Sequence, residues 1–288
     1  MAALRRGNRI ANVAAPIGPL DRFGRWFGGN RQRILPLLSF ALVALAWEVS
    51  ADIGLLNQAF FASPTAIVIA GVRDVQTQLF WGDVRASASE FIVGYGIAVF
   101  AGLVFGFTMG WFRRFGYFFR PWIDALNATP SLALMPLVLI WFGLGASSKV
   151  AIVFITTFVP VVVNIYTGAR TVDQKFLRVA AGFGASRTFL LRSVVVPSIA
   201  PFGFAAARLG VGRAVSGVVV GEFFSAQAGL AYRLFQDAQL LQTARLLFGA
   251  LTITFLALGA FRFVSFAESR TLRWRVTASG MSRLARNA

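Results

Sequence analysis

The feature that most constrains this 288-residue chain is a series of apolar stretches, each about 20 residues long and nearly free of charge. A helix of about 20 apolar residues is long enough to cross the hydrocarbon core of a bilayer. Only 14% of the residues are charged and 57% are hydrophobic, whereas a soluble domain needs more charge to cover its surface. The sequence therefore predicts an all-α protein, a polytopic bundle of membrane-spanning helices.

Six spans are predicted from these stretches. They run roughly from Ile34 to Ala51, Ala88 to Trp111, Pro121 to Phe142, Val150 to Thr167, Ser198 to Val220 and Leu246 to Phe266. The chain is thereby divided into a basic tail (1–33), a transmembrane domain (34–270) that contains a long loop at 169–197, and a second basic tail (271–288). The first tail lacks the continuous apolar core of a signal peptide, so we expect a cytosolic segment there.

Lys and Arg are distributed unequally between the two sides of the predicted bundle. Of the 28, 21 fall in the first tail, near 111–120, in loop 169–197 and from Arg262 onward, five fall on the other side, and Arg208 and Arg213 fall inside the fifth span. Because basic residues stay on the cytosolic side, both termini and loop 169–197 are predicted to be cytosolic, in the inner (plasma) membrane. The basic residues that orient the spans in the membrane account for the net charge of +17, so we expect no nucleic-acid partner.

The chain has no Cys and no His, which removes disulfides, ordinary zinc sites and histidine acid–base catalysis. It also lacks a Gly-Lys-Ser/Thr phosphate-binding loop, because its two lysines are Lys149, after Ser148, and Lys175, after Gln174. We therefore expect no metal, cofactor or catalytic residue in this chain. A membrane enzyme and a secondary transporter remain alternatives, although no paired acid–base groups and no inverted repeat are evident.

Loop 169–197 interrupts the apolar pattern with a basic, glycine-split segment. Thr171 opens a capping-box pattern, and Gly184 lies where a helix would end in the left-handed conformation. Ser186 can then cap a second short helix that ends at Pro197. The loop is predicted to form two short helices joined at a glycine, which a cytosolic partner can push.

Two further patterns predict helix contacts. Between the first two spans, Ser63 and Pro64 predict the start of an amphipathic helix. Its apolar face is expected to contain Val68, Val72, Val75 and Leu79, and to pack on the bundle or lie on its surface. In the second span, small residues recur at Ala98, Gly102, Gly106 and Gly110, which predicts a close helix contact whose partner the pattern does not identify.

The loop resembles the cytosolic loop of permease subunits of ATP-binding-cassette (ABC) importers. That motif reads Glu-Ala-Ala, three residues, Gly, nine residues, Ile, one residue, Leu-Pro. Its positions are occupied here by Arg178, Val179, Ala180, Gly184, Val194, Val196 and Pro197. Ala180, Gly184 and Pro197 match the motif, whereas Arg178 replaces its Glu. The third span, "PSLALMPLVLIWFGLG", is similar to the signature of the nitrate, sulfonate and taurine branch, although Glu90 stands where relatives usually carry Arg.

The resemblance covers about 34–274 and implies a type I importer (MetI-like) permease fold. It also implies a second permease subunit (a homodimer or a homologue), two cytosolic ATPase subunits that use ATP, and an extracytoplasmic substrate-binding protein. The solute would be small and anionic, such as nitrate, a sulfonate or taurine. Candidates for the translocation path are Arg213, Arg208, Glu222, Pro130 and Pro136.

Arg213 is predicted to lie well inside the hydrocarbon core, about 22 Å along a helix that starts near Ser198. Arginine at that depth must face protein or water. Two hypotheses follow. Arg213 faces the translocation path and favours an anionic substrate, or it forms a buried ion pair with Glu48 or Glu90.

Overall fold

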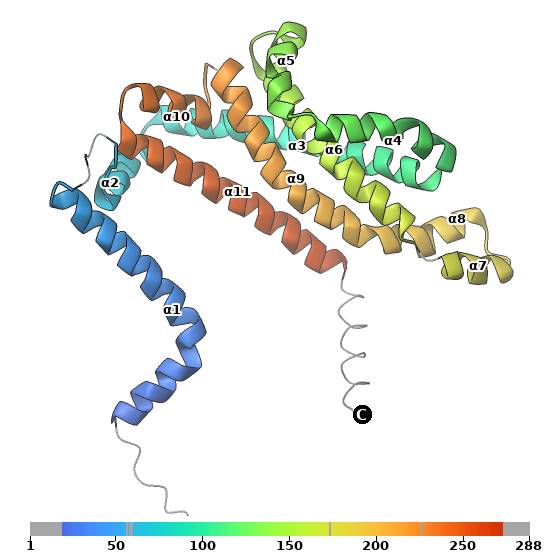
Figure 1. Ribbon diagram of the computed structural model, residues 1–288, viewed down its shortest axis with the longest axis horizontal. Helices are drawn as coiled ribbons and strands as arrows, with labels where there is room; N and C mark the ends of the chain where they lie inside the picture. The colour runs from blue at the N-terminus through green and yellow to red at the C-terminus, as the bar shows by residue number, and fades with distance from the viewer. Residues whose placement is uncertain (1–18, 56, 58–59, 173, 226, 273–288) are drawn as a thin grey trace, which may run out of the picture. The chain divides into compact units, whose positions relative to one another are not determined.

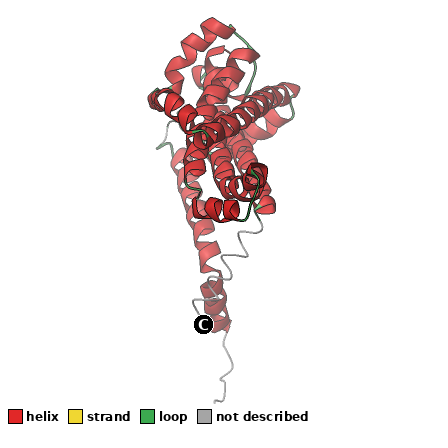
Figure 2. Cartoon of the chain, turned by 90° about the vertical axis from the view of Figure 1, so that its right-hand side faces the viewer, coloured by secondary structure: helices red, strands yellow, loops and turns green. Residues whose placement is uncertain are grey.

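The computed structural model describes residues 19–55, 57, 60–172, 174–225 and 227–272, and these residues form helices and connecting loops without a strand (Figures 1 and 2). The chain divides into two compact units, Met1–Gln58 and Ala59–Ala288. The first unit contains α1 (Pro19–Asp52), which has Pro36 inside the helix. The first predicted span, 34–51, falls within α1, and its crossing of the membrane stays a prediction.

The second unit contains the remaining helices (Figure 1). In chain order they are α2 (Pro64–Val75), α3 (Gln78–Trp111), α4 (Arg113–Ala128), a 3-10 turn (Ser131–Leu134), α5 (Met135–Phe142), α6 (Ala146–Arg170), α7 (Gln174–Gly182), α8 (Arg187–Leu190), a π-helical turn (Leu191–Val195), α9 (Val196–Ser225), α10 (Leu230–Gln239) and α11 (Thr243–Thr271).

Four helical segments of the described residues are long and apolar enough to cross a bilayer: α3, α6, the run 188–224 and α11. The third predicted span is wrong as a single helix, because α4 and the following 3-10 turn with α5 meet at 93°. The bend has a local cause in Pro130. The helical region is disfavoured for a residue that precedes proline, and Thr129 adopts the extended conformation, with φ −78° and ψ 128°. The bent pair adds at most a fifth crossing.

The core of the second unit forms where α6 packs between α3 and α9. A Cβ atom on Gly102 of α3 would come within 2.7 Å of Val161 Cγ1, and one on Gly106 within 2.7 Å of the Val162 carbonyl oxygen. The close contact predicted from the small residues is therefore confirmed, and its partner is α6. Val161 also packs with Ala206 of α9, so α6 links the other two helices.

Helix α2 begins as predicted, because the Ser63 hydroxyl accepts a hydrogen bond from the N–H three residues later, at 3.3 Å. The stripe that starts at Val68 is exposed, however, and does not form the packing face. The helix buries Ile67 and Gly71 instead, and Gly71 lies against the Phe248 ring of α11. A glycine permits this close approach, which hydrophobic periodicity alone does not reveal.

Candidate coupling loop and buried polar cluster

Helix α7 ends in a glycine turn of the predicted kind. Gly184 has φ +76°, and the N–H of Ala185 donates to the carbonyl of Ala180 at 3.1 Å, which closes a Schellman motif. No atom lies within 4 Å of a Cβ built on Gly184. The backbone conformation, and not the available space, therefore requires glycine at this position.

Of the two helix caps predicted in the loop, at Ser186 and Thr171, the first is confirmed and the second is wrong. Ser186 accepts a hydrogen bond from the N–H of Phe189 at 3.2 Å, which confirms the predicted cap of the second loop helix. The role predicted for Thr171 is wrong. Thr171 is the C-cap of α6, and its hydroxyl donates to the Gly168 carbonyl at 2.8 Å, because α6 extends further than the predicted span.

The second loop helix does not stop at Pro197, as predicted, but continues into α9. Residues 188–224 form one run of 37 helical residues that passes through the π-helical turn. In that turn the N–H of Val196 donates to the carbonyl of Leu191, five residues back. The wider turn accommodates Pro197, which has no N–H and would clash with the carbonyl four residues earlier in a regular helix. Helix α8 is therefore continuous with α9.

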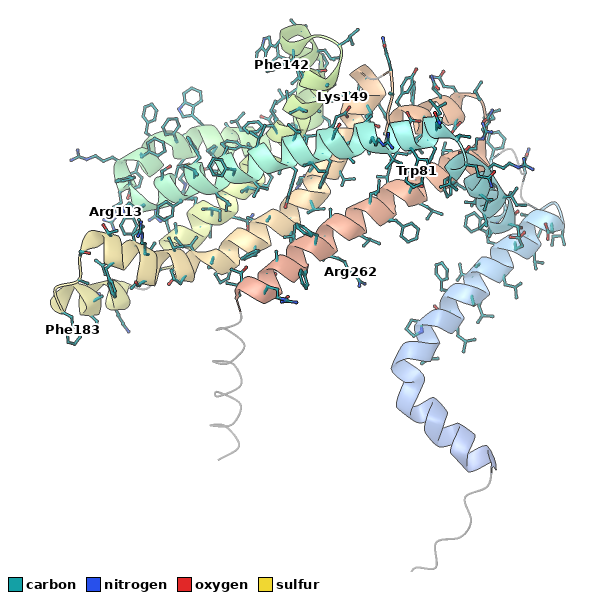
Figure 3. The ribbon with its side chains drawn as sticks, turned by 180° about the vertical axis from the view of Figure 1, so that it is seen from behind. Trp81, Arg113, Phe142, Lys149, Phe183 and Arg262 are labelled. Atoms are coloured by element: carbon teal, nitrogen blue, oxygen red, sulfur yellow. The ribbon has the colours of Figure 1, made fainter. Side chains whose placement is uncertain are left out.

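Large apolar side chains of the loop are left in the open. Val179 is 59% exposed, Phe189 56% and Phe183 89%. They border a groove of about 1130 Å³ between α7, α8 and the start of α9. Figure 3 shows Phe183 at the tip of the unit, far from Lys149. An exposed apolar surface of this kind is typical of a site that binds another protein.

The residues that match the permease motif lie around this groove. Ala180, Val194 and Pro197 are partly buried and line it, together with Val179, whereas Arg178, Gly184 and Val196 are exposed. Val195, which was not among the predicted residues, is 1% exposed and packs with Val161 and Ile199. The run of three valines gave no signal for which of them would be buried.

At the other end of α9, the fully buried Glu222 binds the start of α10. One carboxylate oxygen accepts the Ser87 hydroxyl at 2.5 Å, and the other accepts the N–H of Ala231 at 2.6 Å and of Tyr232 at 3.4 Å. The first N–H groups of a helix lack partners within it, and the helix dipole favours an anion there. Gly229 lies so close to the carboxyl group that a Cβ atom would overlap it.

Two residues of α3 complete the cap of α10. Asp83 accepts the N–H of Gly229 at 3.0 Å and forms an ion pair with Arg233 at 2.9 Å. The Ser87 hydroxyl, which donates to Glu222, also accepts the N–H of Leu230 at 2.9 Å. Ser87 and Glu222 are 135 residues apart in the chain, so no sequence spacing could have paired them.

One turn further along α3, Glu90 forms an ion pair with Lys149 of α6, and both side chains are buried. The hypothesis that Glu90 pairs with Arg213 is therefore wrong. The other partner considered, Glu48, belongs to the first unit. Lys149 could not be predicted as the partner of Glu90, because it lies just before the predicted fourth span, which starts at Val150.

The two arginines of α9 have different surroundings. Arg208 forms an ion pair with Glu268 of α11 at 2.7 Å. Arg213 lies on an exposed face with Gly212 and Ser216, and it makes no ion pair within the described part of the chain. Arg213 is thus exposed and available to a further molecule.

The two prolines predicted near the path both belong to the bend between α4 and α5. Pro130 precedes the 3-10 turn, and Pro136 stands in the first turn of α5, where a missing N–H removes no helical hydrogen bond.

On α10, burial raises the pKa of Asp237, an effect that Arg233 and Arg245 partly offset.

The structure thus combines apolar helices long enough to cross a bilayer with an exposed apolar groove on a helical extension of one of them, which are features of a membrane protein that binds a partner. Residues 98–273 match the family model of the binding-protein-dependent transport system inner membrane component. The chain belongs to this family, and it is a multi-pass permease subunit of an ABC importer, not an enzyme.

Several relatives align over most of the chain. A probable ABC transporter permease protein of Brucella abortus (strain 2308) is 31% identical, over 85% of this chain and 96% of its own length. The putative aliphatic sulfonates transport permease protein SsuC of Bacillus subtilis (strain 168) is 26% identical, over 88% and 91%. The taurine transport system permease protein TauC of Escherichia coli (strain K12) is 28% identical, over 79% and 85%. These relatives agree with the predicted branch.

Solved structures share the fold at lower sequence identity. A chain of an amino acid ABC transporter is 18% identical with a TM-score of 0.53, and the match covers 67% of this chain and 93% of that one. A chain of the methionine ABC transporter MetNI in an inward facing conformation is 16% identical with a TM-score of 0.51, over 68% and 96%. The predicted type I (MetI-like) permease fold is confirmed.

Proposed function

We propose that this chain forms the translocation path for a small anionic solute, and that loop 169–197 couples the path to a cytosolic ATPase. The coupling role is supported mainly by the apolar groove, because the α8 side of the groove continues as a helix without a break into α9. ATP is used by the partner, and this chain binds no cofactor of its own. Closure of the ATPase would push α7 and α8 and so rotate α9.

The proposed assembly contains two ATPase subunits, a second copy of this permease, and an extracytoplasmic substrate-binding protein. Loop 169–197 and both termini face the cytosol, in agreement with the distribution of Lys and Arg. The side chains of Val179, Phe183 and Phe189 would be buried on the ATPase. Full burial of one such side chain contributes about 1.5–3 kcal/mol, so each alters docking by about tenfold or more.

The anionic character of the solute is supported by Arg213. This residue is 17 residues after the start of α9 at Val196, about 25 Å along the axis. Arginine at that depth faces water or protein, and the guanidinium fork suits oxyanions because it offers two parallel donors. Relatives are named for aliphatic sulfonates and taurine, which carry such a group.

The test is uptake into vesicles that contain the permease, the ATPase and the binding protein, with taurine and an aliphatic sulfonate as probes. We expect Arg213→Gln to assemble and hydrolyse ATP normally and to lose about tenfold or more in uptake, whereas Arg213→Lys keeps most of it. Normal uptake by Arg213→Gln would refute the anion path. Uptake without any ATPase would refute the ATP-driven importer and favour a secondary transporter.

A further inference from the structure

Two carboxyl groups and one ammonium group meet where α3, α6 and α9 converge. Glu222 is 0% exposed, Glu90 4% and Lys149 6%. Lys149 forms an ion pair with Glu90. Glu90 lies one turn of α3 after Ser87, whose hydroxyl donates to Glu222 at 2.5 Å, so the two carboxyl groups lie close to each other. Lys149 is labelled in Figure 3, close to α3 and α9. Two buried acids therefore share a single basic partner.

The hydrogen bonds of this cluster are incomplete when both acids are ionised. Both oxygens of Glu222 accept donors, from Ser87 and from the start of α10. Glu90 Oε1 contacts Lys149, but Glu90 Oε2 is buried and has no donor among the described residues. A buried acceptor without a donor is costly, and two carboxyl groups that lie close together disfavour each other's ionisation.

Within the described part of the chain, no cation other than Lys149 forms an ion pair with Glu90 or Glu222. Asp83 of α3 and Arg233 of α10 pair with each other and cancel. Helix α5 has no titratable side chain, and α11 presents apolar residues such as Ile253 and Leu256 beside Glu222. When both acids are ionised, the cluster of Lys149, Glu90 and Glu222 thus carries a net charge of −1. When one acid is protonated, the net charge is zero.

We propose that Glu90 and Glu222 share one exchangeable proton, and that this proton keeps α10 seated on α3 and α9. The proton gives Glu90 Oε2 its missing partner and leaves Glu222 free to accept the N–H groups of α10. When the proton passes to water at high pH, the two carboxylates repel, and Glu222 releases Ser87 and the start of α10. This site lies at the opposite end of α9 from the coupling loop and acts independently of the ATPase.

The decisive variant is Glu90→Gln, because its amide replaces the shared proton with a fixed N–H donor. Lys149 and ionised Glu222 then balance at every pH. Hydrogen exchange of the α10 amides is measured by mass spectrometry on the full-length chain in nanodiscs, and corrected for the intrinsic effect of pH. For the wild-type chain we expect opening to rise about tenfold per pH unit while one linked proton is lost. Glu90→Gln should keep α10 protected and remove this dependence.

Asp124→Asn is the matched control, because it neutralises an acid of the exposed Arg120–Asp124 pair and should leave the dependence unchanged. The same pH dependence in Glu90→Gln as in wild type would overturn the proposal. A second measurement leaves Glu90 and Glu222 unchanged. Infrared spectra of Asp237→Asn, which lacks the other buried acid of α10, should show a protonated carboxyl band that disappears at high pH. Absence of that band at every pH where the protein is folded would also overturn it.

Discussion

Replacement of Gly184 by valine tests the proposed coupling most directly. Gly184 has φ +76°, which glycine adopts freely and which costs other residues about 1–2 kcal/mol, with a β-branched residue such as valine near the upper end. The Cβ atom itself meets no neighbour within 4 Å, so the strain acts only on the backbone turn between α7 and α8. A cost of that size lowers the population of the docking-competent turn by about 5- to 30-fold.

We therefore expect Gly184→Val to insert and to bind the ATPase weakly, with ATP hydrolysis no longer stimulated by substrate-loaded binding protein. Gly182→Val is the matched control. Gly182 lies in the last turn of α7 without positive φ, and its Cβ would also meet open space. Stimulated hydrolysis and uptake are measured in proteoliposomes for both variants. Wild-type stimulation in Gly184→Val, or equal losses in both variants, would refute the argument from backbone strain.

Three further predictions use the rest of the chain. Because the sequence has no Cys, single cysteines at Ser147 and Ser186 can be labelled cleanly. An impermeant reagent added outside should reach Ser147→Cys but reach Ser186→Cys only after the membrane is opened, and the opposite pattern would reverse the orientation. Arg178 is exposed, so Arg178→Glu should change copurification with the ATPase at low salt by less than about fivefold, since exposed ion pairs contribute about 0–1 kcal/mol. A larger loss would place an acidic partner opposite Arg178. Since burial raises the pKa of Asp237, its neutral form stabilises the fold at low pH, and this contribution is lost as the pH rises through the raised pKa. Asp237→Asn should therefore weaken the fall in melting temperature with rising pH, and an unchanged fall would show that another group causes it.

Features set by local chemistry were predictable from the sequence. Long apolar stretches can cross a bilayer only as helices with all backbone groups bonded internally, which determined the class, the end of α3 at Trp111 and both ends of α11 to within about five residues. The start of α3 was not determined in this way, because the helix begins at Gln78, well before the predicted Ala88. The turn at Gly184 and the cap by Ser186 depend on residues fewer than six positions apart. The permease motif around them also identified the family before any contact was known.

Features that depend on packing were decided only by the tertiary structure. Pro130 signals a kink, but its 93° angle depends on how α4 and α5 pack. Pro197 suggests a helix end, yet a π-helical turn accommodates the proline ring and makes the loop helix continuous with α9. The partners of Glu90 and Glu222 come from α6, α3 and α10, and residues so far apart in the chain carry no mutual signal. Charge within a span can therefore be located from sequence, but its neutralisation is set by which helices pack together.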